Sequence, residues 1–276
     1  MFRKLGAIIT ILTGTVFAYA ASAQTLGQPT PWQMGLQAAA DERMRDIVDL
    51  HNFVLYIITA ISIFVLGLLV VIMVRFNAKA NPTPSTTTHN TTLEVAWTII
   101  PVLVLVVIAI PSFRLLYFED TIPPADITIK AIGKQWFWSY EYPDNGNFTF
   151  DSLVLSDRVA AQRKEPRLLG ANNHMVVPLG KTVRLLTTGA DVIHAWTIPA
   201  FGVKIDAIPG RINQTWFKAE KEGLFYGECS ELCGARHAYM PIEVEVLSQE
   251  KFDQWVAEAK TKYATVGAAT RFAANQ

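Results

Sequence analysis

The sequence predicts a membrane-anchored, mainly β protein, with two transmembrane helices, a β domain after them and a short C-terminal helix. Two long uncharged runs in the first half predict the helices. Short alternating segments separated by Gly and Pro predict the β domain. Of the 276 residues, 51% are hydrophobic and 17% are charged, and the formal net charge is zero. Such a chain is too apolar to be disordered and too neutral for a general nucleic-acid-binding protein, so we expect no nucleic acid partner.

The N-terminus has the features of a cleaved secretory signal. An apolar run over residues 5–20 follows Arg3 and Lys4 and ends in Ala21-Ser22-Ala23, an A-x-A site. The alternative is a third membrane helix, but the run is short for about 30 Å of hydrocarbon. We therefore predict a cleaved signal over residues 1–23, followed by a periplasmic segment over residues 24–50.

The next two apolar runs predict a transmembrane hairpin over residues 51–118. The spans cover residues 53–74 and 95–113, and neither contains a charged residue. Both are long enough to cross lipid, and the prolines of the second span are tolerated in membrane helices. The alternative is a pair of buried core helices in a soluble protein.

The loop between the spans indicates the orientation of the hairpin. RFNAKANPTPSTTTHNTTLE contains Arg75 and Lys79 but no acid before Glu94. The positive-inside rule places such a loop in the cytoplasm, although only two basic residues support this placement. The predicted signal gives the same orientation. The chain after residue 118 is then periplasmic, and the signal favours a bacterial inner membrane over an organelle.

Residues 121–248 predict a β sandwich or barrel. Strand-like stretches lie at residues 183–188, 212–217 and 242–246. The last of these alternates apolar residues with Glu243 and Glu245, which predicts one face in water. After it, SQEKFDQWVAEAKTKYA begins with a Ser cap and has apolar residues at helical spacing, which predicts a helix within residues 249–276.

One loop holds both cysteines of the chain. It reads ECSELCGARHAYMP and contains Cys229, Cys233, His237 and Met240. Outside the cytoplasm a disulfide is the simplest alternative, but it leaves the histidine and the methionine unexplained. Methionine is a poor zinc ligand. Thiolate, imidazole and thioether together favour copper.

The number of thiols favours two copper ions. A blue-copper site needs one Cys, two His and a weak Met, so the second cysteine is in excess. Two thiolates can bridge two copper ions, each capped by one imidazole. His194 in DVIHAWTIP is the best second imidazole, although a lone His in an apolar stretch is usually a core residue. The other histidines are weaker candidates, because His51 and His89 lie at or between the spans and His174 lies in a polar turn.

These segments together resemble subunit II of the haem-copper cytochrome c oxidases. DVIHAWTIPAFGVKIDAIPGR and GECSELCGARHAYMPIEVEV carry the resemblance, and KQWFWSYEYPDNG and NTTLEVAWTIIPV extend it upstream. It covers nearly the whole chain after the predicted signal, in the order of the family. The resemblance implies a cupredoxin-like domain carrying a binuclear copper centre, CuA. The implied copper ligands are the side chains of His194, Cys229, Cys233, His237 and Met240 and the backbone carbonyl of Glu231.

The resemblance also implies a docking surface for cytochrome c. Trp136 would be the point at which electrons enter, although strand alternation alone would place it in the core with Trp138 and Tyr140. Carboxylates would steer the basic partner, yet each acid taken alone is an ordinary solvated residue. The candidates are Glu141, Asp144, Asp151, Asp191 and Asp206. Many relatives have Asp where this chain has Asn172-Asn173, which should weaken the patch.

Two further acids receive roles from the resemblance. The carboxylate of Glu231 would bind magnesium or manganese at the boundary with subunit I. Glu94 would form the cytoplasmic entrance of a proton channel, and the alternative for it is a solvated interfacial acid.

The implied function is electron input to cytochrome c oxidase. This subunit would accept electrons from cytochrome c and pass them to the haem of subunit I, where oxygen is reduced and protons are pumped. Further oxidase subunits and membrane lipid are the remaining implied partners. A quinol-oxidase subunit is opposed by the intact copper ligands, and nitrous oxide reductase lacks this hairpin. A membrane-tethered copper carrier should release its ion, whereas five side-chain ligands favour retention.

Overall fold

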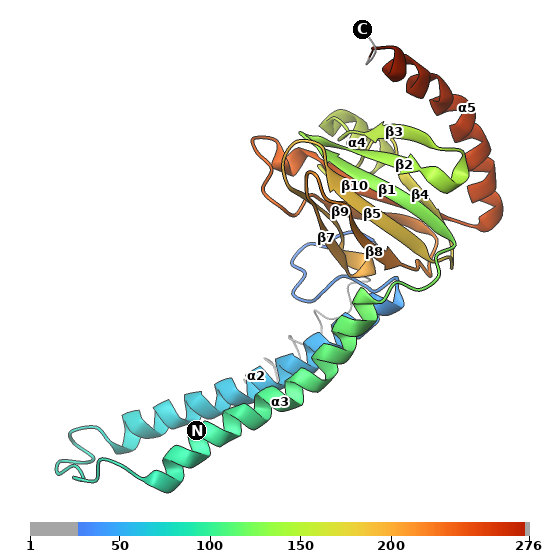
Figure 1. Ribbon diagram of the computed structural model, residues 1–276. Coiled ribbons are helices and arrows are strands. Elements are labelled where there is room, and N and C mark those ends of the chain that lie inside the picture. Colours follow the sequence, from blue (N-terminus) through green and yellow to red (C-terminus); the bar gives the residue numbers. More distant parts are fainter. Residues whose placement is uncertain (1–26, 274–276) are drawn as a thin grey trace.

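The computed structural model describes residues 27–273, with side chains through Tyr263. The predicted signal at residues 1–23 lies outside the described residues. A long helical hairpin projects from a β domain, and a further helix packs on the far side of that domain (Figure 1).

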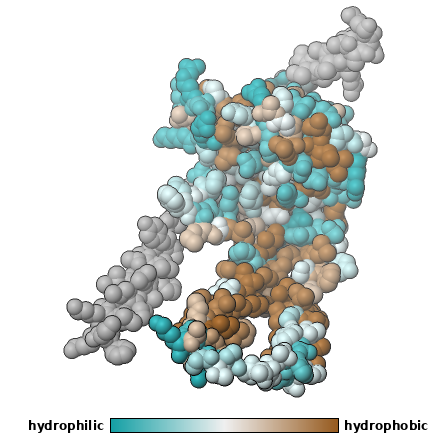
Figure 2. Space-filling model, turned by 90° about the vertical axis from the view of Figure 1, so that its left-hand side faces the viewer, coloured by the Kyte–Doolittle hydropathy of each residue, from teal (hydrophilic) through white to brown (hydrophobic). Residues whose placement is uncertain are grey.

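The hairpin consists of α2 (Glu42–Arg75) and α3 (Thr91–Asp120). Each helix is capped by a side chain, because Asp41 accepts a hydrogen bond from the Arg43 N–H and Asn90 accepts one from the Leu93 N–H. In the described part of the chain, these two helices are long and apolar enough to cross a membrane, and the most apolar window of each is unburied. The apolar surface is continuous along the hairpin (Figure 2). Both helices run beyond the predicted spans, because polar turns at their ends remain helical.

The first sheet of the β domain has five strands in the order β3-β2-β1-β5-β8. They are β1 (Ile127–Lys134), β2 (Phe137–Tyr142), β3 (Phe148–Ser152), β5 (Val183–Gly189) and β8 (Asn213–Phe217). β1 pairs with β5 in parallel and with β2 in antiparallel orientation. Along β1, buried residues alternate with half-buried ones, so one face of this sheet covers the core.

A second sheet has the order β4-β10-β9, with β10 in the centre. Its strands are β4 (Met175–Pro178), β9 (Gly223–Glu228) and β10 (Pro241–Leu247), and a separate pair is formed by β6 (His194–Ile198) and β7 (Val203–Ala207). Residues of all these strands belong to one buried apolar cluster. The domain is therefore a sandwich, as the sequence predicts.

The C-terminal helix, α5 (Gln249–Ala273), covers an aromatic surface of the first sheet. Trp255 packs edge-on against Phe148, with ring centroids 5.7 Å apart, and Tyr263 stacks on Phe150 at 4.8 Å. The Ser248 carbonyl accepts the N–H of Phe252 at the start of the helix. The helix is present as predicted and is anchored by these rings.

One local prediction is wrong. Glu243 on β10 was expected to face water, but its side chain is completely buried. The segment between α4 (Asp157–Arg163) and β4 covers that face of the strand, and the Ala171 N–H donates to Glu243 Oε2 (2.6 Å). Glu245 is half exposed.

The hairpin and the β domain are joined by a buried arginine. Arg43 donates from Nη1 to the Thr215 hydroxyl (2.9 Å) and to the Trp216 carbonyl (2.8 Å) on β8. Its Nε lies 3.5 Å from the Glu119 carboxylate at the end of α3. One charged group therefore links both helices to the edge of the first sheet.

Candidate metal centre

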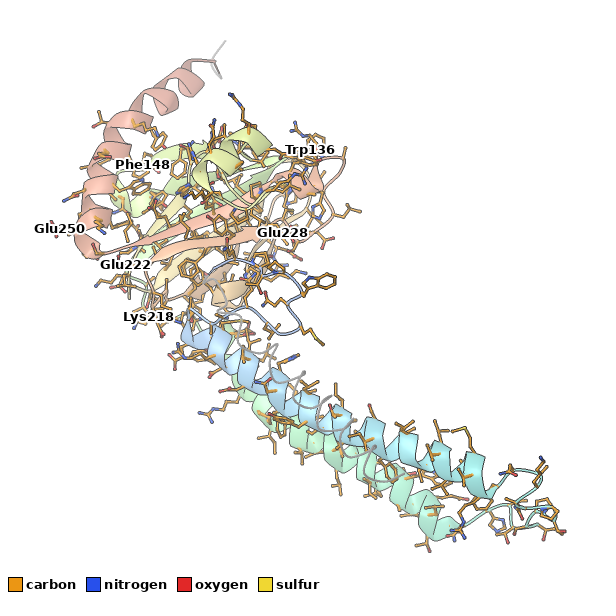
Figure 3. All side chains as sticks on the ribbon, turned by 180° about the vertical axis from the view of Figure 1, so that it is seen from behind. Trp136, Phe148, Lys218, Glu222, Glu228 and Glu250 are labelled. Atoms are coloured by element: carbon orange, nitrogen blue, oxygen red, sulfur yellow. The ribbon has the colours of Figure 1, made fainter. Side chains whose placement is uncertain are left out.

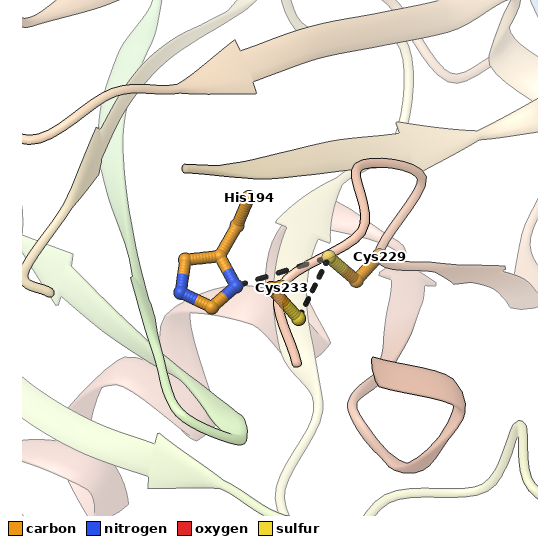
Figure 4. Close-up of side chains that lie close together, drawn as sticks. All are labelled: His194, Cys229 and Cys233. Atoms are coloured by element: carbon orange, nitrogen blue, oxygen red, sulfur yellow. Dashed lines mark hydrogen bonds between the residues drawn. The ribbon is translucent and has the colours of Figure 1, made fainter. Parts of the chain in front are cut away.

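The loop between β9 and β10 brings the two thiols together with His194. Cys229 Sγ lies 3.8 Å from Cys233 Sγ and 3.8 Å from Nδ1 of His194 (Figure 4). Both cysteines are free and buried, and His194 is completely buried at the first position of β6. Two chain segments, far apart in sequence, therefore converge on one place.

The remaining predicted ligands complete the cluster. Cys233 Sγ lies 3.5 Å from Nδ1 of His237 and 3.4 Å from Sδ of Met240. The Glu231 carbonyl lies 3.3 Å from Cys229 Sγ. Met240 is buried and His237 is half exposed, so the cluster reaches the surface through an imidazole. The six groups chosen from the sequence thus lie in one place.

The loop is held in shape by backbone contacts. At its base, the Cys229 N–H donates to the Met240 carbonyl (3.4 Å), and next to it the Ser230 N–H donates to the Ala195 carbonyl on β6 (3.1 Å). Gly234 has φ +121°, a conformation that side chains rarely adopt. These contacts close the loop against the strand that carries His194.

Asp191 orients the buried imidazole. Its Oδ1 accepts from Nε2 of His194 (2.9 Å), which directs Nδ1 toward the sulphur atoms. Its Oδ2 accepts the N–H of Gln135 (2.7 Å). From the sequence, Asp191 is predicted only as a docking acid, although the D-x-x-H spacing could have indicated this contact.

The two thiols differ in acidity. Burial raises the pKa of Cys229, but hydrogen bonds from His194 and from neighbouring backbone groups outweigh burial and lower it to about 7. Burial and the nearby Cys229 raise the pKa of Cys233. One thiolate forms readily, whereas the second requires compensating positive charge, as a bound cation would supply.

Trp136 lies in the turn between β1 and β2 and contacts the cluster. Its indole Nε1–H donates to the carbonyl of Cys233 (3.2 Å), which also accepts from the Gln135 side chain (2.9 Å). Trp136 is half-buried, and it lies on the side of the domain away from α5 (Figure 3). Trp138 and Tyr140 are completely buried in the core, and Trp136 packs against that core from a partly exposed position.

The candidate docking acids lie on several different elements, and two of them form ion pairs with lysines. Glu141 lies 3.5 Å from Lys130, and Asp151 lies 3.8 Å from Lys134. Asp144 accepts the N–H of Thr128 (2.7 Å). Asp206 is exposed, and its side chain has no ion pair among the described residues.

The two other predicted acids lie far apart. Glu231 is exposed on the loop between β9 and β10, so its carboxylate is available to a partner. Glu94 is in the first turn of α3, at the end of the hairpin away from the β domain (Figure 1).

Comparison with known proteins gives the family. Residues 127–247 match the family model "Cytochrome C oxidase subunit II, periplasmic domain", and residues 29–115 match the model of its transmembrane domain. A probable cytochrome c oxidase subunit 2 of Rickettsia bellii is 49% identical over 248 residues, covering 90% of this chain and 91% of the relative. The corresponding subunit of Cereibacter sphaeroides is 44% identical over 269 residues, covering 90% and 88%.

A solved structure is also similar. The periplasmic domain of cytochrome oxidase subunit II of Bradyrhizobium japonicum is 62% identical and covers 52% of this chain and 99% of its own, with a TM-score of 0.49. On the strength of the relatives and their coverage, the chain belongs to the cytochrome c oxidase subunit II family, as a membrane protein with a periplasmic domain whose His, Cys and Met cluster is consistent with the CuA site.

Proposed function

We propose that the cluster holds a binuclear CuA centre and that this subunit accepts electrons from cytochrome c and passes them to the haem of subunit I. The observation that carries the proposal is the convergence of two thiols, two imidazoles, a thioether and a carbonyl in one largely buried pocket.

The residues fit a copper pair better than the alternatives. The donors are soft, which favours copper, and the thioether disfavours zinc. Sulphur atoms 3.8 Å apart can both reach an ion placed between them at about 2.3 Å, the usual length of a metal–thiolate bond. Each cysteine has its own imidazole, His194 for Cys229 and His237 for Cys233. This pairing suits two ions that share two bridging thiolates.

When bound, the copper pair would supply a one-electron redox site whose potential depends on the weak ligands and the apolar surroundings. The protein residues keep the ligands still. Asp191 fixes the His194 ring, and the β9–β10 hairpin fixes both cysteines. The hydrogen bond between Trp136 and the Cys233 carbonyl links the protein surface to a bridging cysteine, which supports Trp136 as the point at which electrons enter.

The remaining roles belong to the same proposal. Exposed carboxylates, with Asp206 the least compensated, would steer cytochrome c to Trp136. Glu231 would offer its carboxylate to magnesium or manganese shared with subunit I. Glu94, at the cytoplasmic end of the hairpin, would admit protons to a channel in subunit I.

The copper assignment can be tested on the full-length chain in detergent, loaded with copper. Metal analysis should give two coppers per chain, and electron paramagnetic resonance should give a seven-line hyperfine pattern, because one electron is shared by two copper nuclei. Cys229→Ser and Cys233→Ser should each abolish this spectrum, since each thiolate would bridge both ions. Glu250→Gln, on the surface of α5, is the control that should leave it unchanged. A four-line spectrum from a single ion would exclude the binuclear site.

A further inference from the structure

A second cluster of side chains that could bind a metal lies outside the β9–β10 loop. Glu165 follows α4, His174 precedes β4, and Glu243 lies on β10. A nitrogen of the imidazole and one oxygen of each carboxylate lie within 4.8 Å of one another. None of these residues is a copper ligand, and the proposed function gives them no role.

The carboxylates of this cluster are buried without enough partners. Glu243 is completely buried, and its Oε2 accepts the Ala171 N–H, but its Oε1 has no hydrogen bond. Burial raises the pKa of Glu243 to about 7, and the nearby Tyr226 on β9 offsets this only slightly. Oε2 of Glu165 is also buried and unpartnered, and the side chain is 8% exposed. A buried carboxylate oxygen without a partner is destabilising, so a bound cation would stabilise both carboxylates.

The local backbone makes room for the inward-facing carboxylate. A Cβ added at Gly170 would overlap Oε2 of Glu165. A glycine at this position therefore lets Glu165 turn toward the cluster. Arg163, which forms an ion pair with Glu165, is about half exposed and lies 3.9 Å from the other oxygen, Oε1. Such an exposed pair compensates the buried charge only weakly.

The histidine has the arrangement of a metal ligand. Its Nε2 lies 3.4 Å from Oε2 of Glu243, and its Nδ1 lies 3.3 Å from Oε2 of Glu245. Metal-binding imidazoles usually donate their second N–H to a carboxylate, which fixes the ring and makes the ligating nitrogen more basic. Here Glu245 would orient His174, and Nε2 would face the ion together with the two buried carboxylates.

We propose that Glu165, His174 and Glu243 form a binding site for Zn²⁺, separate from the copper cluster. One imidazole nitrogen and two carboxylate oxygens are ligands that zinc accepts, and a water molecule would fill the remaining position because His174 is partly exposed. No sulphur lies in the group, which disfavours copper in its reduced state. The ion would tie the α4–β4 segment to β10, the strand that follows the copper loop.

Zinc content of the copper-loaded full-length chain tests the site. After dialysis against Zn²⁺ and removal of free metal, the wild type should retain one zinc per chain. His174→Asn and Glu243→Gln should weaken zinc binding by at least about tenfold, since loss of supporting residues alone costs 10–100-fold. Glu243→Gln keeps an oxygen for the Ala171 N–H, so the fold should survive. The matched controls are His89→Asn in the interhelical loop and Glu250→Gln on α5, which should bind zinc as the wild type does.

X-ray absorption at the zinc edge identifies the ligands. The expected first shell contains only nitrogen and oxygen, with the scattering of one imidazole. Zinc uptake should persist in a Cys229→Ser/Cys233→Ser variant, so failure of the copper assignment would not affect this result. Sulphur in the zinc shell, or equal zinc retention in the wild type and His174→Asn, would overturn the proposal.

Discussion

At the scale of single residues, the metal loop depends on neighbours that bind no metal. Asp191 accepts from Nε2 of His194, and Trp136 donates to the carbonyl of Cys233. The first contact sets which imidazole nitrogen faces the sulphur atoms. The second attaches a half-buried aromatic ring directly to the loop. Both side chains therefore influence the centre from outside the ligand set.

Replacing Trp136 should separate electron transfer from binding. In Trp136→Ala, reduction of copper by cytochrome c should slow by about tenfold or more, equivalent to roughly 1.4 kcal/mol in the barrier. Affinity for cytochrome c and its salt dependence should change little, because carboxylates supply the attraction. Stopped-flow reduction at several ionic strengths measures both quantities.

Two comparisons make this experiment specific. Trp136→Phe keeps an aromatic ring but loses the hydrogen bond to Cys233, so it should fall between the wild type and the alanine variant. The copper spectrum should be intact in both. A loss of affinity equal to the loss of rate would instead assign Trp136 to binding.

At the scale of elements, β10 connects the two candidate metal sites. It begins just after Met240 and lies between β4 and β9, and the α4–β4 segment covers its Glu243. Parallel pairing with β4 places Val244 opposite Met175, so His174 comes close to Glu243. Glu243, which the alternating pattern of its strand predicts to face solvent, is thus buried by a neighbouring segment.

The buried carboxylate on β10 should make stability depend on pH when metal is absent. Burial is the main reason that the pKa of Glu243 is raised to about 7; Glu165 also raises it, whereas His174, the Ala171 N–H and Tyr226 lower it. Because the folded pKa exceeds the unfolded value, this stabilising contribution is complete below about pH 4.5 and is lost as the pH rises through 7. The pKa of His174 is also raised, by Glu245 and Glu243 although burial opposes it, so its contribution is lost in the same direction.

The measurement compares chemical denaturation of the full-length chain with and without chelator between pH 5 and pH 8. With chelator, the free energy of unfolding of the wild type should fall as the pH rises from 5 to 8. Relative to Glu243→Gln, this fall should be at most about 3 kcal/mol. Zinc should remove most of the fall in the wild type. Other groups titrate too, so the difference between the two proteins is the quantity to follow. Parallel pH profiles for both would contradict the raised pKa.

At the scale of the whole molecule, the hairpin places the His, Cys and Met cluster and Glu94 on opposite sides of the membrane. Arg43 fixes the helices to the edge of the β domain, on the side where the chain emerges from lipid. Glu94 lies at the opposite end of α3. The copper cluster and the candidate proton entrance therefore belong to different aqueous compartments.

Glu94→Ala in the assembled oxidase should test this separation. Reduction of copper by cytochrome c should stay fast, whereas the proton-coupled reduction of the oxygen site should slow. Glu250→Ala on the periplasmic domain is the control and should leave both steps unchanged. Slower copper reduction with a normal later step would contradict the orientation of the hairpin. Time-resolved optical spectroscopy follows the two steps separately.

The sequence by itself determined the hairpin, the β domain, the C-terminal helix and the set of His, Cys and Met residues that the structure brings together. These follow from local periodicity and short spacing, which do not depend on how distant segments pack. The ligand chemistry also identified His194, since a second imidazole was required. The copper roles, the docking acids and Glu94 remain predictions for the experiments above.

Only the tertiary structure decided which of the residues predicted to face solvent are in fact buried. His174 reads as part of a polar turn and Glu243 as the wet face of a strand, and they are 69 positions apart in the chain. The register between β4 and β10, together with the α4–β4 segment that covers them, brings the two side chains to 3.4 Å. No periodicity in either segment encodes that meeting, because pairing between distant strands is set by the packing of the whole core.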